Sequence, residues 1–313
     1  MGQMKRAGVV LLLAAAAVHA AVMPQLTVKV GVDLVNVLFT VTDRKGNLVS
    51  GLTRQDFLVE EDGKKQDIQF FSPENELPLT LGLLIDTSPS VQPTFDQERA
   101  AANRFLESVI RPKDLALVIG FEKSVTLVQD FTDDIRLLQR AVNSLEIGPT
   151  MDGGTSMFDA IYLASREKLR SEAGRKAIIL ISDGDDTTSK VRGNEAMIAV
   201  HGSDAVIYSI AIGGSWQNGF RNRRSAGIGD HGTLKRLSEE TGGSFFRVDA
   251  RREFDEAFAT IDEQLRRQYS LGFVSSNAVK DGKYRRIRII PRDSTFRIQA
   301  RKGYYAPRRP DSQ

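Results

Sequence analysis

The chain has 313 residues, of which 41% are hydrophobic and 27% charged, and it contains no cysteine. This composition is too apolar for a disordered chain, and the length fits one large or two ordinary globular domains. The absence of cysteine excludes disulfides, thiolate metal sites, cysteine nucleophiles and the lipid-attachment cysteine of a bacterial lipoprotein.

Residues 1–20 have the layout of a cleaved secretory signal. Lys5 and Arg6 precede the apolar run 9–18, and Ala20 offers a small side chain at the expected cleavage site. About ten apolar residues are too few for a membrane span, which needs about 20, although an uncleaved anchor is the alternative. We therefore expect no transmembrane span in the mature chain and an exported protein that is periplasmic, attached to the cell surface or secreted.

The net charge of the mature chain is close to zero. Removal of Lys5 and Arg6 reduces the 43 basic residues to 41, against 40 acidic residues. Binding to nucleic acid depends on clustered positive charge, so no nucleic-acid partner is expected.

Alternating apolar residues predict β-strands at both ends of the chain. The alternation runs through 26–41, with a change of phase near Leu34, and it returns at 269–273. Neither end has enough strands to bury a core alone. We therefore expect the segments 21–76 and 268–307 to pair into one β-sandwich.

The middle of the chain, 77–267, has the pattern of a doubly wound α/β domain with a mostly parallel sheet. Stretches with helical periodicity alternate with near-continuous apolar runs, which are typical of strands buried on both faces. The four apolar runs are Leu79 to Ile85, Leu115 to Ile119, Ala177 to Ile181 and Ala205 to Ile212. This domain would be inserted between the two halves of the sandwich, and 308–313 would form a disordered tail.

Three polar loops are expected at one edge of this sheet. Two of them follow the runs that end at Ile85 and Ile181, and the third opens a predicted helix before Phe158. The carboxyl ends of parallel strands lie together, so these loops should converge. Their oxygen-bearing side chains are Asp86, Ser88, Ser90, Thr155 and Asp183. Two carboxylates and three hydroxyls suit a hard divalent cation, which we expect to be Mg²⁺, with Mn²⁺ or Ca²⁺ as alternatives.

Such a ligand set favours a binding module rather than an enzyme. Two carboxylates neutralise a dication, while weakly donating hydroxyls leave it Lewis acidic and able to exchange a water for an Asp or Glu of a protein partner. The sequence has no HExxH and no GxSxG motif, and it indicates no general base. Two alternatives stay open: a metal-assisted hydrolase, and a scaffold in which the metal is purely structural.

The Asp-x-Ser-x-Ser pattern with its later Thr and Asp resembles the metal-ion-dependent adhesion site (MIDAS) of the von Willebrand factor type A (VWA) domain. The resemblance covers 77–267, and the flanks, notably 51–57 and 302–305, are similar to the acidobacterial-type VWFA-related subgroup. It implies a Rossmann-like sheet and divalent-cation-dependent adhesion or protein binding. It also implies direct binding by both serines, direct or water-mediated binding by Thr155, and partly water-mediated binding by both aspartates. Pro89 departs from the family pattern and stiffens the loop.

Two other motifs carry less weight. The spacing Gly227-x-Gly229-x-x-Gly232 matches a dinucleotide fingerprint, but it follows a polar loop rather than a strand. Asp183 could begin an EF-hand, but Thr188 stands where that loop needs glycine.

Overall fold

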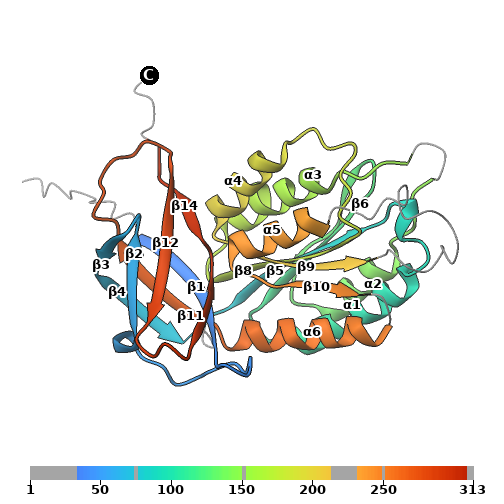
Figure 1. The fold of residues 1–313 in the computed structure, drawn as a ribbon. Helices are drawn as coiled ribbons and strands as arrows, with labels where there is room; N and C mark the ends of the chain where they lie inside the picture. Colours follow the sequence, from blue (N-terminus) through green and yellow to red (C-terminus); the bar gives the residue numbers. More distant parts are fainter. Residues whose placement is uncertain (1–33, 74–76, 150–152, 213–230, 249–250, 309–313) are drawn as a thin grey trace, which may run out of the picture. The chain divides into compact units, whose positions relative to one another are not determined.

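The computed structural model describes residues 34–73, 77–149, 153–212, 231–248 and 251–308 (Figure 1). The predicted signal, the start of the first alternating segment, two glycines of the dinucleotide-like motif and the end of the predicted tail lie outside these ranges. Arg308, the first residue of that predicted tail, forms a β-bridge with Asp281.

A six-stranded sheet with the order β10-β9-β8-β5-β6-β7 forms the centre of the α/β part. Its strands are β5 (Leu79–Asp86), β6 (Leu115–Phe121), β7 (Val125–Thr132), β8 (Arg175–Ser182), β9 (Val206–Ile212) and β10 (Phe245–Val248). The four predicted apolar runs are the four central strands, and all neighbours pair in parallel except β6 and β7. The expected doubly wound, mostly parallel sheet is therefore confirmed.

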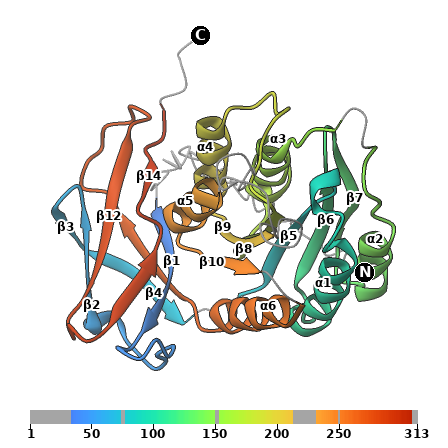
Figure 2. The same cartoon turned by 45° about the vertical axis from the view of Figure 1, so that its right-hand side comes forward.

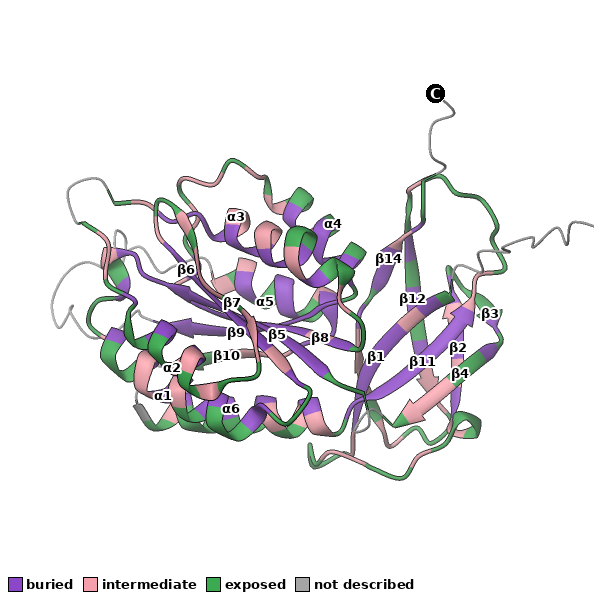
Figure 3. Cartoon of the chain, turned by 180° about the vertical axis from the view of Figure 1, so that it is seen from behind, coloured by how far each residue is buried: buried purple, intermediate pink, exposed green. Residues whose placement is uncertain are grey.

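Helices cover both faces of this sheet (Figure 2). One face carries α1 (Phe95–Val109), α2 (Ile135–Asn143) and α6 (Arg251–Arg266), and the other carries α3 (Met157–Tyr162), α4 (Gly193–Ser203) and α5 (His231–Thr241). Along β5, Leu83 packs toward α1 and Leu84 toward α3, because successive side chains of a strand point to opposite faces. Figure 3 shows the central strands buried along their length.

Short helical turns complete the α/β part and the N-terminal segment. They are the 3₁₀ turns η1 (Arg54–Asp56), η2 (Pro89–Val91) and η5 (Leu169–Ser171), and the π-helical segment η4 (Leu163–Lys168) that continues α3. None of the helices in the described ranges has the length and apolar character that crossing a bilayer requires.

The two ends of the chain form two antiparallel four-stranded sheets. Their strands are β1 (Leu34–Thr42), β2 (Phe57–Glu61), β3 (Lys64–Gln66), β4 (Ile68–Pro73), β11 (Tyr269–Val274), β12 (Tyr284–Pro291), β13 (Arg297–Ala300) and β14 (Gly303–Tyr305). The sheet orders are β13-β1-β11-β4 and β14-β12-β2-β3, so each sheet mixes strands from both ends. In particular, β11 lies between β1 and β4.

Both antiparallel sheets contribute to one hydrophobic core. Phe39 of β1 packs edge-on against Phe57 of β2, with ring centroids 5.1 Å apart, and stacks on Tyr269 of β11 at 5.4 Å. The chain leaves this sandwich after β4 and returns two residues after α6. The predicted insertion of the α/β domain into a sandwich made by both chain ends is confirmed.

Candidate metal centre

The first loop of the site begins at Asp86, the last residue of β5. Its side chain is fully buried, and its two oxygen atoms have different donors. Oδ1 accepts a hydrogen bond from the backbone N–H of Ser88 at 2.9 Å, and Oδ2 accepts one from the hydroxyl of Ser182 at 2.6 Å. Because Ser182 is the last residue of β8, Asp86 joins the ends of two neighbouring strands.

Ser88 and Ser90 present a pair of hydroxyls in the same loop. Their Oγ atoms lie 3.0 Å apart, with Ser88 buried and Ser90 exposed. Pro89 starts the 3₁₀ turn η2, where its fixed φ suits the backbone. A hydrogen bond joins the two hydroxyls at this distance, and neighbouring ligands about 2.1 Å from an octahedral Mg²⁺ would be about as far apart.

Thr155 lies in a segment that touches the other two loops. Its N–H donates to Thr187 Oγ1 at 2.9 Å, and its carbonyl accepts from the N–H groups of Thr187 and Thr188 at 2.9 and 3.1 Å. Two residues earlier, a Cβ atom on Gly153 would lie 3.6 Å from the ring of Pro89. These hydrogen bonds join Thr155 itself to the loop after β8.

Asp183 begins the loop after β8 and is half-buried. Its Oδ1 accepts from the N–H of Asp185 at 3.1 Å, while Gly184 donates to Ser182 Oγ at 3.0 Å. Gly184 has φ +90°, a conformation that favours glycine and lets the chain turn sharply after the strand. The structure thus brings all three predicted loops to the carboxyl end of the sheet.

Among the described residues, the two aspartates of the site have no basic partner. Burial raises the pKa of Asp86 to about 6 and the charge of Asp183 adds to this, although hydrogen bonds from Ser182 and Ser88 oppose it. In the part of the chain that the structure describes, neither aspartate forms an ion pair with a basic side chain. The described residues also include no group of three His, Cys, Asp or Glu side chains placed to hold a metal. A cation here would therefore depend on the hydroxyls as well as the carboxylates.

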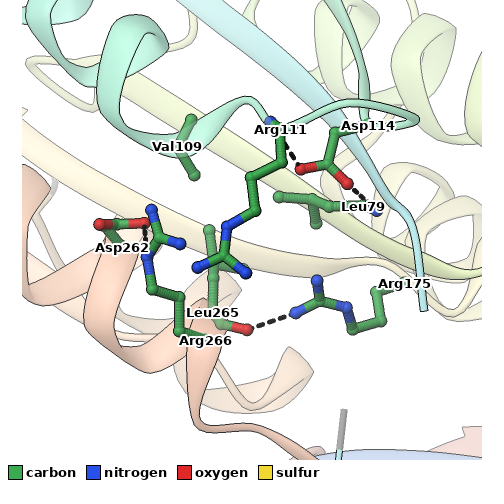
Figure 4. Close-up of a pocket in the computed structure, with 8 residues that line it drawn as sticks. All are labelled: Leu79, Val109, Arg111, Asp114, Arg175, Asp262, Leu265 and Arg266. Atoms are coloured by element: carbon green, nitrogen blue, oxygen red, sulfur yellow. Dashed lines mark hydrogen bonds and ion pairs between the residues drawn. The ribbon is translucent and has the colours of Figure 1, made fainter. Parts of the chain in front are cut away.

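Two carboxylates, Asp114 and Asp262, lie at the opposite end of the same sheet (Figure 4). Asp262 pairs with Arg266 at 2.7 Å, and Arg111 lowers the pKa of Asp262 against the larger, raising effect of burial. Asp114 accepts hydrogen bonds from the backbone N–H groups of Leu79 and Arg111 at 2.8 and 3.0 Å. Asp262 therefore has a basic partner, whereas Asp114, like Asp86, is held by neutral donors of the protein.

Two residues near the site escaped the sequence analysis. Ser182 gives no distinctive signal, because a serine before an aspartate at a strand end is common. Glu98 offers a weak one: it lies seven residues before Phe105, on the apolar face of α1, where a charged residue is unexpected. Glu98 is fully buried, and its pKa is raised to about 8, chiefly by burial and also by the charges of Asp86 and Asp183.

Comparisons with known proteins agree with this architecture. Residues 81–185 match the family model of the von Willebrand factor type A domain. An uncharacterized protein of Borreliella burgdorferi is 23% identical over 220 residues, which cover 64% of this chain and 63% of that relative. The chain thus spans less than two thirds of the curated relative that it matches. The acidobacterial-type subgroup stays a prediction.

Two solved structures are similar to the chain. Proximal thread matrix protein 1 from the mussel byssus, with a zinc-occupied MIDAS motif, is 14% identical with a TM-score of 0.51, covering 64% of this chain and 48% of that one. A von Willebrand factor type A structure from Catenulispora acidiphila is 12% identical with a TM-score of 0.49, covering 88% and 74%. At such identities the likeness concerns the fold alone. Because the family model matches residues 81–185, which include all five predicted site residues, the chain contains a von Willebrand factor type A domain.

Proposed function

We propose that this chain is an exported binding module that holds a divalent cation at its VWA domain and uses it to capture an acidic side chain of a protein partner. The ligands would be Asp86, Ser88, Ser90, Thr155 and Asp183. The observation that carries the proposal is the pair of serine hydroxyls 3.0 Å apart beside a buried aspartate that has no basic partner among the described residues.

The donor set indicates which ion is bound. All five side chains offer oxygen, which favours Mg²⁺, Mn²⁺ or Ca²⁺ over the ions that prefer nitrogen or sulfur. We put Mg²⁺ first among these ions, and the spacing of the two serine hydroxyls is compatible with it. Zinc belongs in any titration, because the similar byssus protein has a zinc-occupied MIDAS motif.

The same residues suit capture of a carboxylate. Asp86 is held by Ser182 and the Ser88 N–H, so its position is fixed before any ion arrives. Ser90 is exposed, so the site can be reached from solvent. When bound, the ion would supply a Lewis-acid position that accepts a carboxylate oxygen of the partner.

The two histidines of the predicted mature chain give little support to hydrolysis. His201 lies on α4, packed against Tyr284 and Tyr305, and burial lowers its pKa to about 4, helped by the charge of Arg301. His231 begins α5, away from the three site loops in sequence. Binding is therefore favoured over a metal-assisted hydrolase, for which a general base is still needed.

Thermal unfolding with and without cations tests the site. Mg²⁺ or Mn²⁺ at 100 times its Kd should stabilise the domain by about 2.7 kcal/mol, a rise of a few degrees in Tm. Asp86→Ala should remove this rise. Asp185→Ala, which alters an exposed carboxylate of the loop after β8, should keep it. Absence of any shift with Mg²⁺, Mn²⁺, Ca²⁺ and Zn²⁺ would contradict the proposal.

Capture from envelope and culture fractions tests the partner. A protein partner should be retained by the wild-type chain in Mg²⁺ and lost in EDTA or with Asp86→Ala. Retention under all three conditions would place the binding surface elsewhere. Export is tested by sequencing the N-terminus of the mature protein, which should begin at Ala21.

A further inference from the structure

A buried glutamate lies on the helix that follows the first loop of the site. Glu98 belongs to α1 and is 0% exposed. The hydroxyl of Thr94 donates to Glu98 Oε1 at 2.5 Å and also lies 3.2 Å from the carbonyl of Val91, the last residue of η2. The other oxygen of Glu98, Oε2, is buried without a hydrogen-bond partner in the described structure. The carboxyl group is thus tied to the site loop on one side and unpaired on the other.

An ionised Glu98 at this buried position would destabilise the fold unless a cation compensates its charge. An ionised carboxylate in a protein interior needs a cation or several donors, and Glu98 has one hydroxyl donor. Asp86 and Asp183 are near enough for their charges to raise its pKa further, beyond the larger effect of burial. No ion pair to Glu98 occurs within the described ranges. A buried acidic side chain with so few partners is found mostly at functional sites.

We propose that Glu98 is an outer carboxylate of the cation site, which increases cation affinity through its negative charge and through its unpaired oxygen as an acceptor for a water bound to the ion. The inference rests on the proposed cation site. Glu98 acts from outside the ligand set, since the described residues contain no three-carboxylate cluster placed to hold a metal. Together with Asp86 and Asp183, Glu98 would give the dication three acidic neighbours. The dication would in turn compensate the charge of these acids, which have no basic partner among the described residues.

The substitution Glu98→Gln separates this role from a structural one. Glutamine keeps the volume of the side chain and a carbonyl oxygen that can accept the hydrogen bond from Thr94. It removes the negative charge and puts an NH₂ group in place of the second carboxylate oxygen. A merely structural Glu98 predicts unchanged cation affinity. An outer carboxylate predicts affinity at least tenfold weaker, the usual effect of losing a partner outside the ligand set. In EDTA at neutral pH the variant should be as stable as the wild type or more so, because the amide takes up no proton when the chain folds.

The experiment is a Mn²⁺ titration of the full chain, followed calorimetrically, with urea unfolding in EDTA on the same samples. Glu107→Gln is the matched control, because it removes a charge from an exposed position of the same helix. It should bind Mn²⁺ as the wild type does. A Glu98→Gln affinity within twofold of the wild type overturns the inference and leaves the proposed function standing. If the wild type binds Mn²⁺ no better than Asp86→Ala does, both the inference on Glu98 and the proposed function are overturned. Should Glu98→Gln fail to fold, Glu98→Met replaces it with the same expectations.

Discussion

Without a cation, the free energy of unfolding should fall as the pH rises through neutrality, and Glu98 should account for most of the fall above pH 6.5. The pKa of Glu98 is about 8 in the fold against an ordinary value of 4.5. Between these values the folded state binds more protons at Glu98 than the unfolded chain does. The contribution of Glu98 to the free energy of unfolding is therefore fully present below pH 4.5 and is lost as the pH rises toward 8. Linkage then gives a loss of about 1.6 kcal/mol between pH 6.5 and 8.

The window from pH 6.5 to 8 isolates this glutamate from the other shifted groups of the α/β domain. Asp86, with a pKa of about 6 against 3.8, acts in the same direction, but its contribution changes by only about 0.2 kcal/mol there. His201 has a pKa lowered from 6.5 to about 4, so it acts in the opposite direction, mostly below pH 6.5, and offsets the loss by about 0.4 kcal/mol within the window. The slope in this window therefore reports on Glu98.

Urea unfolding in EDTA, followed by far-UV circular dichroism at several pH values, measures the effect. The midpoint for the wild type should fall from pH 6.5 to 8 while the m-value stays constant. The midpoint for Glu98→Gln should be nearly flat over the same range, since the amide does not ionise. Parallel curves for the two proteins would refute the assignment of a raised pKa to Glu98.

Two further predictions concern packing and buried polar groups. Gly243→Ala should lower the free energy of unfolding by more than about 3 kcal/mol, because the new Cβ atom would lie 1.9 Å from the carbonyl oxygen of Ile207. Gly202→Ala, in α4, should raise it by up to about 1 kcal/mol, because the new Cβ atom would have no neighbouring atom within 4 Å. Equal Tm shifts for the two would contradict this. Tyr304→Phe should cost about 1–3 kcal/mol in urea unfolding, because Glu61 is buried and loses the phenolic donor at 2.5 Å; an unchanged midpoint would show that the bond adds nothing.

The apolar runs predicted the central strands because burial on both faces leaves little choice of side chain. The run Leu79 to Ile85 became β5, in which every residue is buried. The edge strand β7 was not identified, since none of its residues 125–132 is fully buried and its pattern is irregular. A connection of only three residues after β6 makes it antiparallel, because parallel neighbours need a long crossover.

The pairing of the chain ends could be argued from edge strands, but its register could not. The expectation that 21–76 and 268–307 share a sandwich came from the need to cover exposed edges. Which strands meet depends on side chains far apart in sequence, as in the stacking of Phe39 on Tyr269. Alternation alone cannot select among such partners, because many registers bury the same faces.

For the site, loop positions could be predicted and supporting groups could not. Asp86 and Asp183 follow buried strands, so topology places them at one edge. Glu98 reaches the same region from a helix, and only the packing of α1 on the sheet decides that this position is buried. The hydrogen bond from Ser182 likewise depends on the register between β5 and β8.

The two ends of the sheet differ in whether the described residues supply a basic partner to a buried carboxylate, and this difference supports the proposed cation. At the amino end of β5, Asp262 has the basic partner Arg266 at 2.7 Å. At the carboxyl end, the buried acid of Asp86 has only hydroxyl and amide donors. An arginine beside Asp86 would stabilise the fold permanently and also occupy the place of a ligand. Because Asp86 has no basic partner among the described residues, its burial lowers stability at neutral pH, and a dication that binds there would raise stability through linkage.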